Sequence, residues 1–518
     1  MEQTILSIDC GTQSLRAILF SLKGEVLGMQ KIPFEPYKSP KPGWAEQDPE
    51  IYWETLQAAC QKLKKEYPEE FSRMAGLGVT ALRDSMVNLD KAGNSLRPIM
   101  VWLDQRKADP VYHPGMGMKL LIKSIGLTDV LTKAQRDGKC NWIRQNQPEI
   151  WEKTHKYVQV SGFLNYRLTG EFKDSVASQI GHIPFDYKKQ QWANTSDLMA
   201  FGAKLYPVEK EKLSELVKPG EIIGRITKQA SEESGLPENL PVVACGSDKG
   251  CETMGMGVLS NEMASLSFGT TATIQTTSKK YIEPIRFMPA YPAVVPGLFN
   301  PEVEIFRGFW MITWFKNEFA QKEVELAKAR GVSAEEVLNE LLAQSPPGAM
   351  GLVAQPYWSP GLSEPVAKGA MIGFGDVHKK PHVYRAVIEG LAYALRDGSD
   401  KIEKVSKRKI QRLAVSGGAS QSDEICRIAA DVFNLPIVRG RTTETSGLGA
   451  AMVTAYGTGK FASMEEAVNE MVHYEKTFTP DKNNVEIYDM LYKRVYRKMY
   501  RTLEPLYHEI REITGYPE

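Results

Sequence analysis

The sequence lacks long apolar runs, clustered cysteines and a signal-like leader. No run of apolar residues approaches the roughly 18 that a membrane-spanning helix needs, which excludes a membrane span. The six cysteines are dispersed without a CxxC pair, which excludes the common zinc and dithiol sites and favours a reduced, cytoplasmic protein. A strand-like run begins near residue 4, so no signal peptide is expected.

The sequence also lacks an excess of positive or negative charge. Lys and Arg total 64 and Asp and Glu total 63, leaving a formal net charge of +1. Nucleic-acid-binding proteins need concentrated positive charge, so nucleic acid is not an expected partner. The basic stretch at 401–409 includes Glu403 and is interpreted as the solvated face of a helix.

Three sequence motifs for phosphate or acyl chemistry are absent. Gly457-Thr458-Gly459-Lys460 is followed by Phe461 and lacks the glycine spacing of a Walker A loop. No GxSxG elbow occurs, and no GxGxxG follows a strand-like run. Any phosphate must therefore be held by hairpin N–H groups or helix N-termini.

Two short segments, Ile8–Ser14 and Leu266–Thr271, have a common pattern. Each follows an apolar strand-like run, turns at Gly-Thr and enters a second strand-like run. The backbone N–H groups of such a hairpin can face an oxyanion, although an ordinary β-turn also fits each segment alone. Only the first segment carries a carboxylate, Asp9, which suits a divalent cation on a polyphosphate.

The 518 residues are enough for two or three domains. Strand-like runs and helical patterns alternate, which predicts an α/β architecture with covered sheets, and the second half repeats the scheme of the first. Strands are expected at 4–10, 16–22, 25–34, 76–80, 86–89, 242–246 and 412–415, and a hairpin at 263–275. Helices are expected from Asp48-Pro49-Glu50 and near 310–320, 333–342, 382–396, 423–433 and 485–510.

Asp248 lies just past the end of the apolar strand expected at 242–246, after Ser247. Ligands of open α/β sheets bind beyond the carboxyl ends of strands, and a carboxylate there can accept the proton of an attacking hydroxyl. The alternative interpretation is that Asp248 is only the N-cap of the next helix.

Three further segments suit small polar ligands. The turn Ser416–Ala419 would let a base or ribose approach bare backbone, or it is a plain strand-to-helix turn. Arg83 and Asp84 pair fixed donors with an acceptor and could hold several hydroxyls of a polyol, or form a surface ion pair. Trp102 could lie against a carbon chain, or belong to the core.

Taken in order, these segments resemble the FGGY family of carbohydrate kinases, whose fold is shared with actin, hexokinase and the ATPase domain of heat-shock chaperones. The resemblance runs from about residue 4 to residue 500. It rests on Ile8–Thr12 with Arg16, Gly43–Pro49, Val101–Arg106, Tyr166–Glu171, Gly246–Asp248, Gly369–Gly373, His382–Gly390, Ser416–Ala419 and Ser446–Ala451.

The resemblance implies an α/β fold of two actin-like, ribonuclease H-like ATPase lobes with a cleft between them. Residues 1–256 would form the N-terminal lobe, with the sugar site, the first phosphate hairpin and the catalytic aspartate. Residues 257–518 would form the C-terminal lobe, with the second phosphate hairpin, the adenosine site and the C-terminal helix. The implied activity is ATP-dependent phosphorylation of a hydroxyl of a sugar, ketose or polyol, and a homodimer is left open.

The resemblance also implies residue roles. Asp248 would be the general base, and Asp9 would position Mg²⁺ on the ATP phosphates. The sugar would be bound by Arg83, Asp84, Trp102 and Asp248, the phosphates by Thr12, Gln13, Arg16, Gly269 and Thr270, and the adenosine by Gly417, Gly418 and Ala419.

The identity of the substrate stays open at this point. Thr80–Ser85 is similar to the glycerol kinase pattern, but Asp84 stands where that pattern has a glutamate. The Met-His pair of xylulose kinases is absent from this loop, yet 91–106 and 166–171 resemble the xylulose kinases. The helix at 309–315 has bulky residues and Thr313 where the glycerol enzyme has small residues and a glutamine, which leaves its nucleotide contacts open.

Three alternatives are weighed against this prediction. One is a glycerol-specific kinase of the same fold. A chaperone or filament ATPase is disfavoured because such proteins lack the polyol loop at 80–106. A non-catalytic sugar-sensing protein of the ATPase fold is disfavoured because Asp9 and Asp248 are both intact.

Overall fold

The computed structural model describes residues 2–124, 126–194, 201–361 and 363–516. The chain forms two compact units. Unit 1 consists of Met1–Gly257, Tyr291–Phe299 and Glu444–Val472, and unit 2 of Val258–Ala290, Asn300–Thr443 and His473–Glu518. The sequence-based division after residue 256 places 291–299 and 444–472 in the second domain, whereas both segments pack with unit 1.

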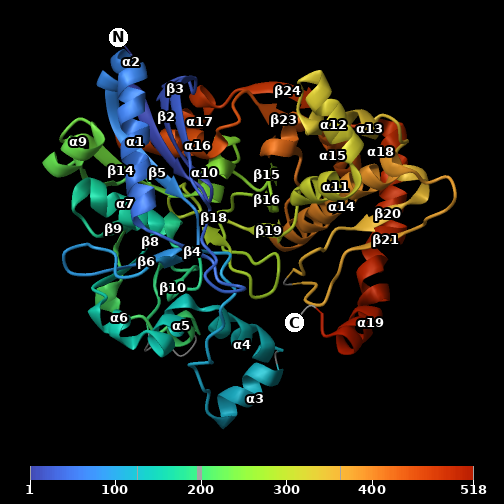
Figure 1. Ribbon diagram of the computed structural model, residues 1–518, viewed down its shortest axis with the longest axis horizontal. Helices are drawn as coiled ribbons and strands as arrows, with labels where there is room; N and C mark the ends of the chain where they lie inside the picture. The colour runs from blue at the N-terminus through green and yellow to red at the C-terminus, as the bar shows by residue number, and fades with distance from the viewer. Residues whose placement is uncertain (1, 125, 195–200, 362, 517–518) are drawn as a thin grey trace. The chain divides into compact units, whose positions relative to one another are not determined.

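Unit 1 is built on a six-stranded mixed sheet (Figure 1). Its three central strands β14, β5 and β1 are parallel, and the outer strands pair antiparallel. In spatial order the strands are β13 (Ile222–Arg225), β14 (Pro241–Ser247), β5 (Met74–Ala81), β1 (Thr4–Cys10), β2 (Ser14–Ser21) and β3 (Val26–Pro33).

Unit 2 contains a second six-stranded sheet with the same pairing scheme. β15, β22 and β23 are parallel, and the outer strands are antiparallel, so β15 and β16 correspond to β1 and β2. This confirms the internal repeat that the sequence predicts. In spatial order the strands are β19 (Glu302–Ile305), β16 (Ala272–Gln275), β15 (Met263–Phe268), β22 (Arg412–Ser416), β23 (Ile437–Gly440) and β24 (Tyr474–Phe478).

Helices cover both faces of the unit 1 sheet because its inner strands β14, β5, β1 and β2 are buried along almost their whole length. Leu6, Ile8 and Cys10 of β1 pack in one buried cluster with α1 (Glu50–Glu66) and α7 (Val160–Thr169). Side chains alternate along a strand, so Asp9 points to the opposite face. That face is covered by α16 (Thr445–Gly457), which packs on β1, β5 and α10 (Asp248–Gly255).

The largest cluster of unit 2 surrounds α14 (Lys380–Ser406), which is longer than the helix predicted at 382–396. The other predicted helices are present, and Ser333 and Glu336 form the expected capping box. The remaining helices of this unit are α11 (Trp310–Phe319), α12 (Gln321–Arg330), α13 (Ala334–Leu342), α15 (Asp423–Phe433), α18 (Lys482–Leu491), a π-helical turn (Tyr492–Tyr496) and α19 (Arg497–Thr514), with a hairpin of β20 (Val353–Gln355) and β21 (Ala370–Ile372).

Unit 1 also contains a second, four-stranded sheet and a set of shorter elements. The sheet consists of β4 (Glu46–Gln47), β7 (Ile99–Met100), β6 (Met86–Leu89) and β8 (Lys156–Gln159). The shorter elements are α2 (Pro68–Ser72), α3 (Met116–Ser124), α4 (Thr128–Asp137), α5 (Lys139–Asn146), α6 (Pro148–Lys153), α8 (Phe201–Leu205), α9 (Lys228–Ser234), α17 (Met464–Met471), β9 (Lys173–Ser175), β10 (Phe185–Asp186), β11 (Gln191–Trp192) and β12 (Glu215–Val217).

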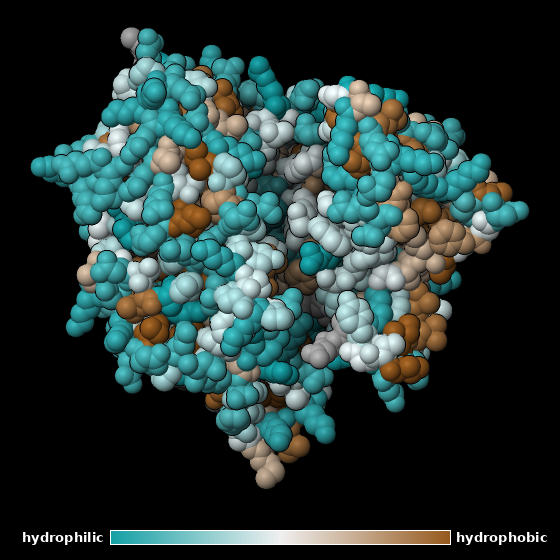
Figure 2. Space-filling view, viewed as in Figure 1, coloured by the Kyte–Doolittle hydropathy of each residue, from teal (hydrophilic) through white to brown (hydrophobic). Residues whose placement is uncertain are grey.

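The visible surface is mainly hydrophilic (Figure 2). An exception lies on α19, where Leu506, Ile510 and Ile513 are exposed at helical spacing. Within the described ranges, no helix is both long enough and apolar enough to cross a membrane.

The close packing of α10 against α16 depends on glycines, which have no side chain at the contact. A Cβ on Gly449 would overlap the carbonyl oxygen of Cys251 in α10. We expect Gly449→Ala to lower the free energy of unfolding by about 1–3 kcal/mol through overpacking. Gly117→Ala in α3 is the matched control, because a Cβ there meets nothing within 4 Å. Chemical denaturation of both variants checks the prediction, and equal stabilities would contradict it.

Candidate functional site

The first predicted phosphate hairpin lies in unit 1, between β1 and β2. Asp9 and Arg16 are directly opposite each other in this antiparallel pair. Arg16 Nη1 donates to Asp9 Oδ2 at 2.9 Å, and Arg16 Nε lies 3.2 Å from Oε2 of Glu444, just before α16. The structure therefore brings Asp9 and Arg16 together, and adds Glu444, whose position 435 residues along the chain from Asp9 gives no local signal in the sequence.

Asp9 is buried, with 6% of its surface exposed. Burial raises the pKa of Asp9 to about 6, with Asp248 and Glu444 adding to the rise and Arg16 opposing it. A cation would relieve this cost of burying a carboxylate. Among the residues that the structure describes, no group of three or more acidic, His or Cys side chains could hold a metal by itself. Asp9 thus fits Mg²⁺, which proteins hold through one or two carboxylates together with substrate phosphates.

Asp248 occupies the first position of α10, directly after β14. The N-cap is Ser247, whose Oγ accepts from the backbone N–H of Gly250 at 3.2 Å. The interpretation of Asp248 as an N-cap is therefore wrong, because its neighbour has that role. Burial raises the pKa of Asp248, and the charges of Arg83 and Lys249 oppose the rise. The side chain is a partly buried carboxylate that feels the charges of two cations.

Arg83 and Asp84 follow β5 and have different surroundings. The Arg83 guanidinium lies 5.3 Å from the centre of the Tyr291 ring. Asp84 Oδ2 accepts from Lys139 Nζ at 2.6 Å and contacts His182 Nδ1 at 3.0 Å. Although burial acts in the opposite direction, Lys139 and His182 hold the pKa of Asp84 well below its usual range. Nothing in the local sequence identifies Lys139 or His182.

Trp102 adjoins the first hairpin. Its Nε1–H donates to Thr12 Oγ1 at 3.1 Å, and 38% of its surface is exposed. In the same turn, the carbonyl of Gln13 accepts from the backbone N–H of Phe34 at 3.0 Å. Trp102, which is predicted to contact the sugar, and Thr12, which is predicted to bind phosphate, are therefore neighbours. Trp102 does not belong to the core.

The second predicted hairpin lies in unit 2. Ser267 of β15 is in parallel register with Ser416 of β22, so the turn at Gly269 and the turn at 417–419 begin at the same edge of the sheet. Gly417 has φ +85°, and a Cβ there would come within 2.7 Å of the Phe268 carbonyl carbon. Only glycine fits this approach. Gly418 has open space around it, which leaves its backbone accessible.

The start of α11 packs against this second turn. The backbone N–H of Phe309 donates to Gly269 O at 3.0 Å, and the Phe309 and Phe268 rings are 4.4 Å apart. Phe309 and Phe315 are buried in the core of unit 2. These bulky residues therefore support the turn by packing.

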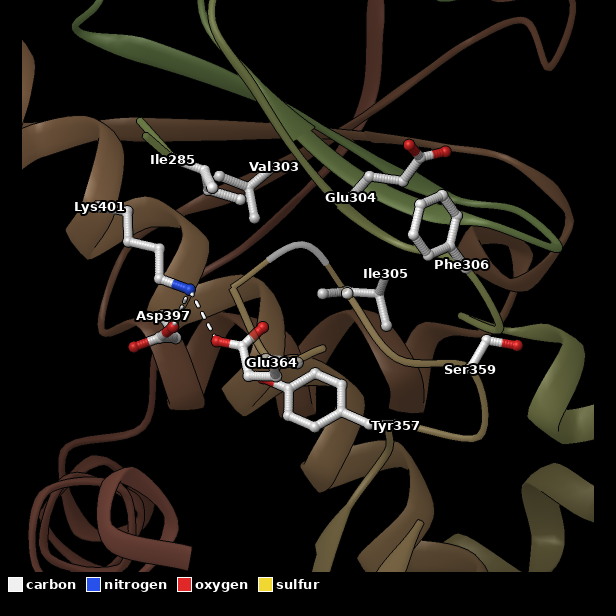
Figure 3. Close-up of a pocket in the computed structure, with 12 residues that line it drawn as sticks. Ile285, Val303, Glu304, Ile305, Phe306, Tyr357, Ser359, Glu364, Asp397 and Lys401 are labelled. Carbon is white, nitrogen blue, oxygen red and sulfur yellow. Dashed lines mark hydrogen bonds and ion pairs between the residues drawn. The ribbon is translucent and has the colours of Figure 1, made fainter. Parts of the chain in front are cut away.

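Unit 2 also contains a pocket lined by residues that include Tyr357, Glu364 and Lys401 (Figure 3). Lys401 lies in it, 2.9 Å from Asp397 and 3.2 Å from Glu364. The interpretation of Lys401 as part of a solvated helix face is therefore wrong, because this side chain of α14 forms ion pairs with Asp397 and Glu364. None of the residues predicted to bind nucleotide lines this pocket.

Comparison with known proteins places this geometry in context. Residues 4–255 match the N-terminal domain, and residues 264–458 the C-terminal domain, of the FGGY family of carbohydrate kinases. The chain is 27% identical over 518 residues to the xylulose kinase of Lactococcus lactis subsp. lactis (strain IL1403), covering 98% of each. It is 29% identical over 491 residues to the glycerol kinase of Thermococcus onnurineus (strain NA1), covering 93% of this chain and 94% of that one.

A solved structure supports the fold assignment. The xylulose kinase from Rhodospirillum rubrum superposes with a TM-score of 0.79 at 26% identity, covering 98% of this chain and 100% of that one. Together with the repeated six-stranded sheets, this confirms the predicted α/β class and the actin-like ATPase fold of the two units.

Proposed function

This chain belongs to the FGGY family of carbohydrate kinases, and is accordingly a phosphotransferase that acts with ATP on sugars or polyols; we propose which residues carry the reaction and which substrates it takes. The observation that carries the proposal is the placement of Asp248. A partly buried carboxylate with a raised pKa stands at the carboxyl end of β14, where the charge of Arg83 acts on it. Such a group suits proton abstraction from a substrate hydroxyl.

Asp248 is the proposed general base. As the substrate hydroxyl attacks the γ-phosphorus of ATP, its proton passes to the Asp248 carboxylate, and ADP leaves with the bridging oxygen. Arg83 keeps the pKa of Asp248 from rising further, which maintains the ionised form that accepts the proton. Arg83, Asp84 and Trp102 are the proposed neighbours of the sugar.

The phosphates are assigned to the two hairpin turns. Thr12, Gln13 and Arg16 supply donors in unit 1, and Gly269 and Thr270 supply backbone N–H groups in unit 2. The adenosine is assigned to Gly417, Gly418 and Ala419, where Gly418 leaves the backbone open.

Asp9 is the proposed partner of Mg²⁺. When bound, the ion neutralises negative charge that develops on the phosphates during transfer. Arg16 fixes the orientation of the Asp9 carboxylate through its hydrogen bond to Oδ2, and Glu444 fixes Arg16 in turn. The six cysteines, all free and buried, accord with the proposed cytoplasmic location.

The proposed substrate is a ketose or a polyol, and a glycerol-specific kinase is the second candidate. The xylulose kinase and glycerol kinase relatives support these two possibilities; Arg83 matches the glycerol kinase pattern, whereas Asp84 stands where that pattern has a glutamate. An ADP-release screen of the purified protein with glycerol, erythritol, pentitols, xylulose and ribulose tests the proposal. ADP release with none of them would contradict it, and release with glycerol alone would select the second candidate.

Asp9→Asn should weaken productive binding of Mg·ATP while the protein stays folded. The variant keeps the shape of the side chain and removes the negative charge that a divalent cation needs. Titration of activity against Mg²⁺ at fixed ATP measures the effect as a higher half-saturating concentration. A Mg²⁺ titration curve identical to that of the wild type would rule out the metal assignment.

A further inference from the structure

Both carboxylate oxygens of Asp84 in unit 1 are hydrogen-bonded to neighbouring polar groups of the protein. Asp84 Oδ1 accepts from the backbone N–H of His182 at 2.9 Å. Oδ2 binds Lys139 Nζ at 2.6 Å and His182 Nδ1 at 3.0 Å, and Lys139 also donates to the Asp84 carbonyl at 2.6 Å. Asp84 is therefore anchored by protein groups, and its carboxylate has little accepting capacity left for a substrate.

The backbone around this cluster is held in an unusual conformation. Asp84 has φ +52°, and Gly181 has φ +140°. The Asp84 N–H donates to Ile180 O at 3.0 Å, and a Cβ on Gly181 would come within 2.9 Å of Asp84 Cα. A non-glycine residue in the left-handed region costs energy and persists where its surroundings hold it, a feature that concentrates at functional sites. The segment 180–182 therefore packs closely against Asp84 and hydrogen-bonds to it.

The His182 ring presents one free nitrogen. A carboxylate only accepts hydrogen bonds, so Nδ1 carries the proton toward Asp84, and Nε2 is left to exchange a hydrogen bond with another group. The side chain is 34% exposed and meets Tyr206 edge-on at 5.8 Å. Among the residues that the structure describes, none hydrogen-bonds to Nε2. His182 therefore offers an oriented and partly exposed ring nitrogen.

A series of contacts leads from the segment of His182 toward Arg83. The Tyr187 hydroxyl hydrogen-bonds the backbone of Gly181 at 3.1 Å, and its ring lies 5.5 Å from Tyr291, the residue under Arg83. Arg83 in turn acts on the charge of Asp248. The contacts therefore run from Asp84 and His182 through the two tyrosines to Arg83, whose charge acts on Asp248.

We infer that His182, held by Asp84 and Lys139, is a further sugar-binding residue whose Nε2 accepts a hydrogen bond from a substrate hydroxyl distant from the one that Asp248 deprotonates. Asp84 and Lys139 are then positioning residues that act through His182. The inference rests on the proposed function and deepens it. A substrate that reaches both Asp248 and His182 has a longer carbon chain than glycerol.

His182→Ala tests the direct contact. With the best substrate of the screen, the variant should raise KM about 10-fold, the effect of losing one hydrogen bond, with little change in kcat or in KM for ATP. Activity on glycerol, measured in parallel, should change little. His182→Gln keeps an acceptor oxygen in reach and should recover part of the loss. His113→Ala is the matched control, because this exposed histidine of unit 1 belongs to no proposed site.

A double-variant cycle tests the positioning role. Asp84→Asn should raise KM for the sugar as His182→Ala does, and the double variant should be no worse than either single one, because both changes remove the same contact. A merely structural role for Asp84 would instead give additive losses or an equal change in KM for ATP.

The outcomes separate the inference from the proposed function. A wild-type protein that releases no ADP with any sugar or polyol contradicts the proposed function itself. With an active wild type, the inference is overturned if His182→Ala and His182→Gln both keep the wild-type KM for the sugar, or if glycerol is the only substrate. Should His182→Ala fail to fold, the KM of His182→Gln decides the point.

Discussion

Asp248→Asn should lower kcat by roughly 10²- to 10⁴-fold, the usual contribution of a positioned general base, while the KM values for ATP and sugar stay nearly unchanged. The substitution keeps the side-chain shape and removes the atom that accepts the proton. Ser247 continues to cap α10, so the helix does not depend on the carboxylate. Steady-state kinetics on the purified variant measure the loss.

Asp174→Asn is the matched control for this experiment. Asp174 is likewise an aspartate of unit 1 whose pKa is raised by burial, to about 6. Its carboxylate binds Ser161, Asn165 and Gln179 and has no role in the proposed site. We expect Asp174→Asn to change stability and to spare kcat. If the Asp248→Asn enzyme keeps more than half of the wild-type kcat, Asp248 is not the general base.

Arg83→Ala should lower kcat/KM for the sugar by roughly 10- to 100-fold, with little change in KM for ATP. The guanidinium offers fixed donors, and its removal leaves substrate hydroxyls unpaired at about 1–3 kcal/mol for each buried group. Two kinetic series, one varying sugar and one varying ATP, separate the effects. Arg167→Ala is the matched control, because Arg167 lies over Phe163 as Arg83 lies over Tyr291, and it pairs with Glu50 outside the proposed site.

The same variant should also move the acidic limb of the pH profile. Arg83 lowers the pKa of Asp248, so its removal lets that pKa rise further. The base then stays protonated up to a higher pH, and kcat/KM begins to fall at a higher pH than in the wild type. An Arg83→Ala enzyme that loses affinity for ATP but retains its affinity for sugar and its pH profile would show that Arg83 is not in the sugar site.

The sequence by itself determined the positions of the strands and turns that carry the chemistry. Alternating and continuous apolar runs are local patterns, and they locate β1, β14, β15 and β22 within a few residues. Asp9, Asp248 and Gly417 stand at the ends of these strands, so their candidacy follows from the order of the residues. The repeat of the two sheets is visible in the same patterns, because strand-like runs and helical patterns follow each other in a similar order in both halves of the sequence.

The tertiary structure alone decided which groups meet. The sequence does not specify that α16 packs with unit 1, since this depends on glycines such as Gly449 fitting against α10 from a distant part of the chain. The partners of Asp84 come from a helix start at Lys139 and a loop at His182, far away in sequence and without a shared pattern. Burial changes a carboxylate's pKa only once the fold excludes water from it, so the different electrostatic states of Asp9, Asp84 and Asp248 exist only in the packed protein.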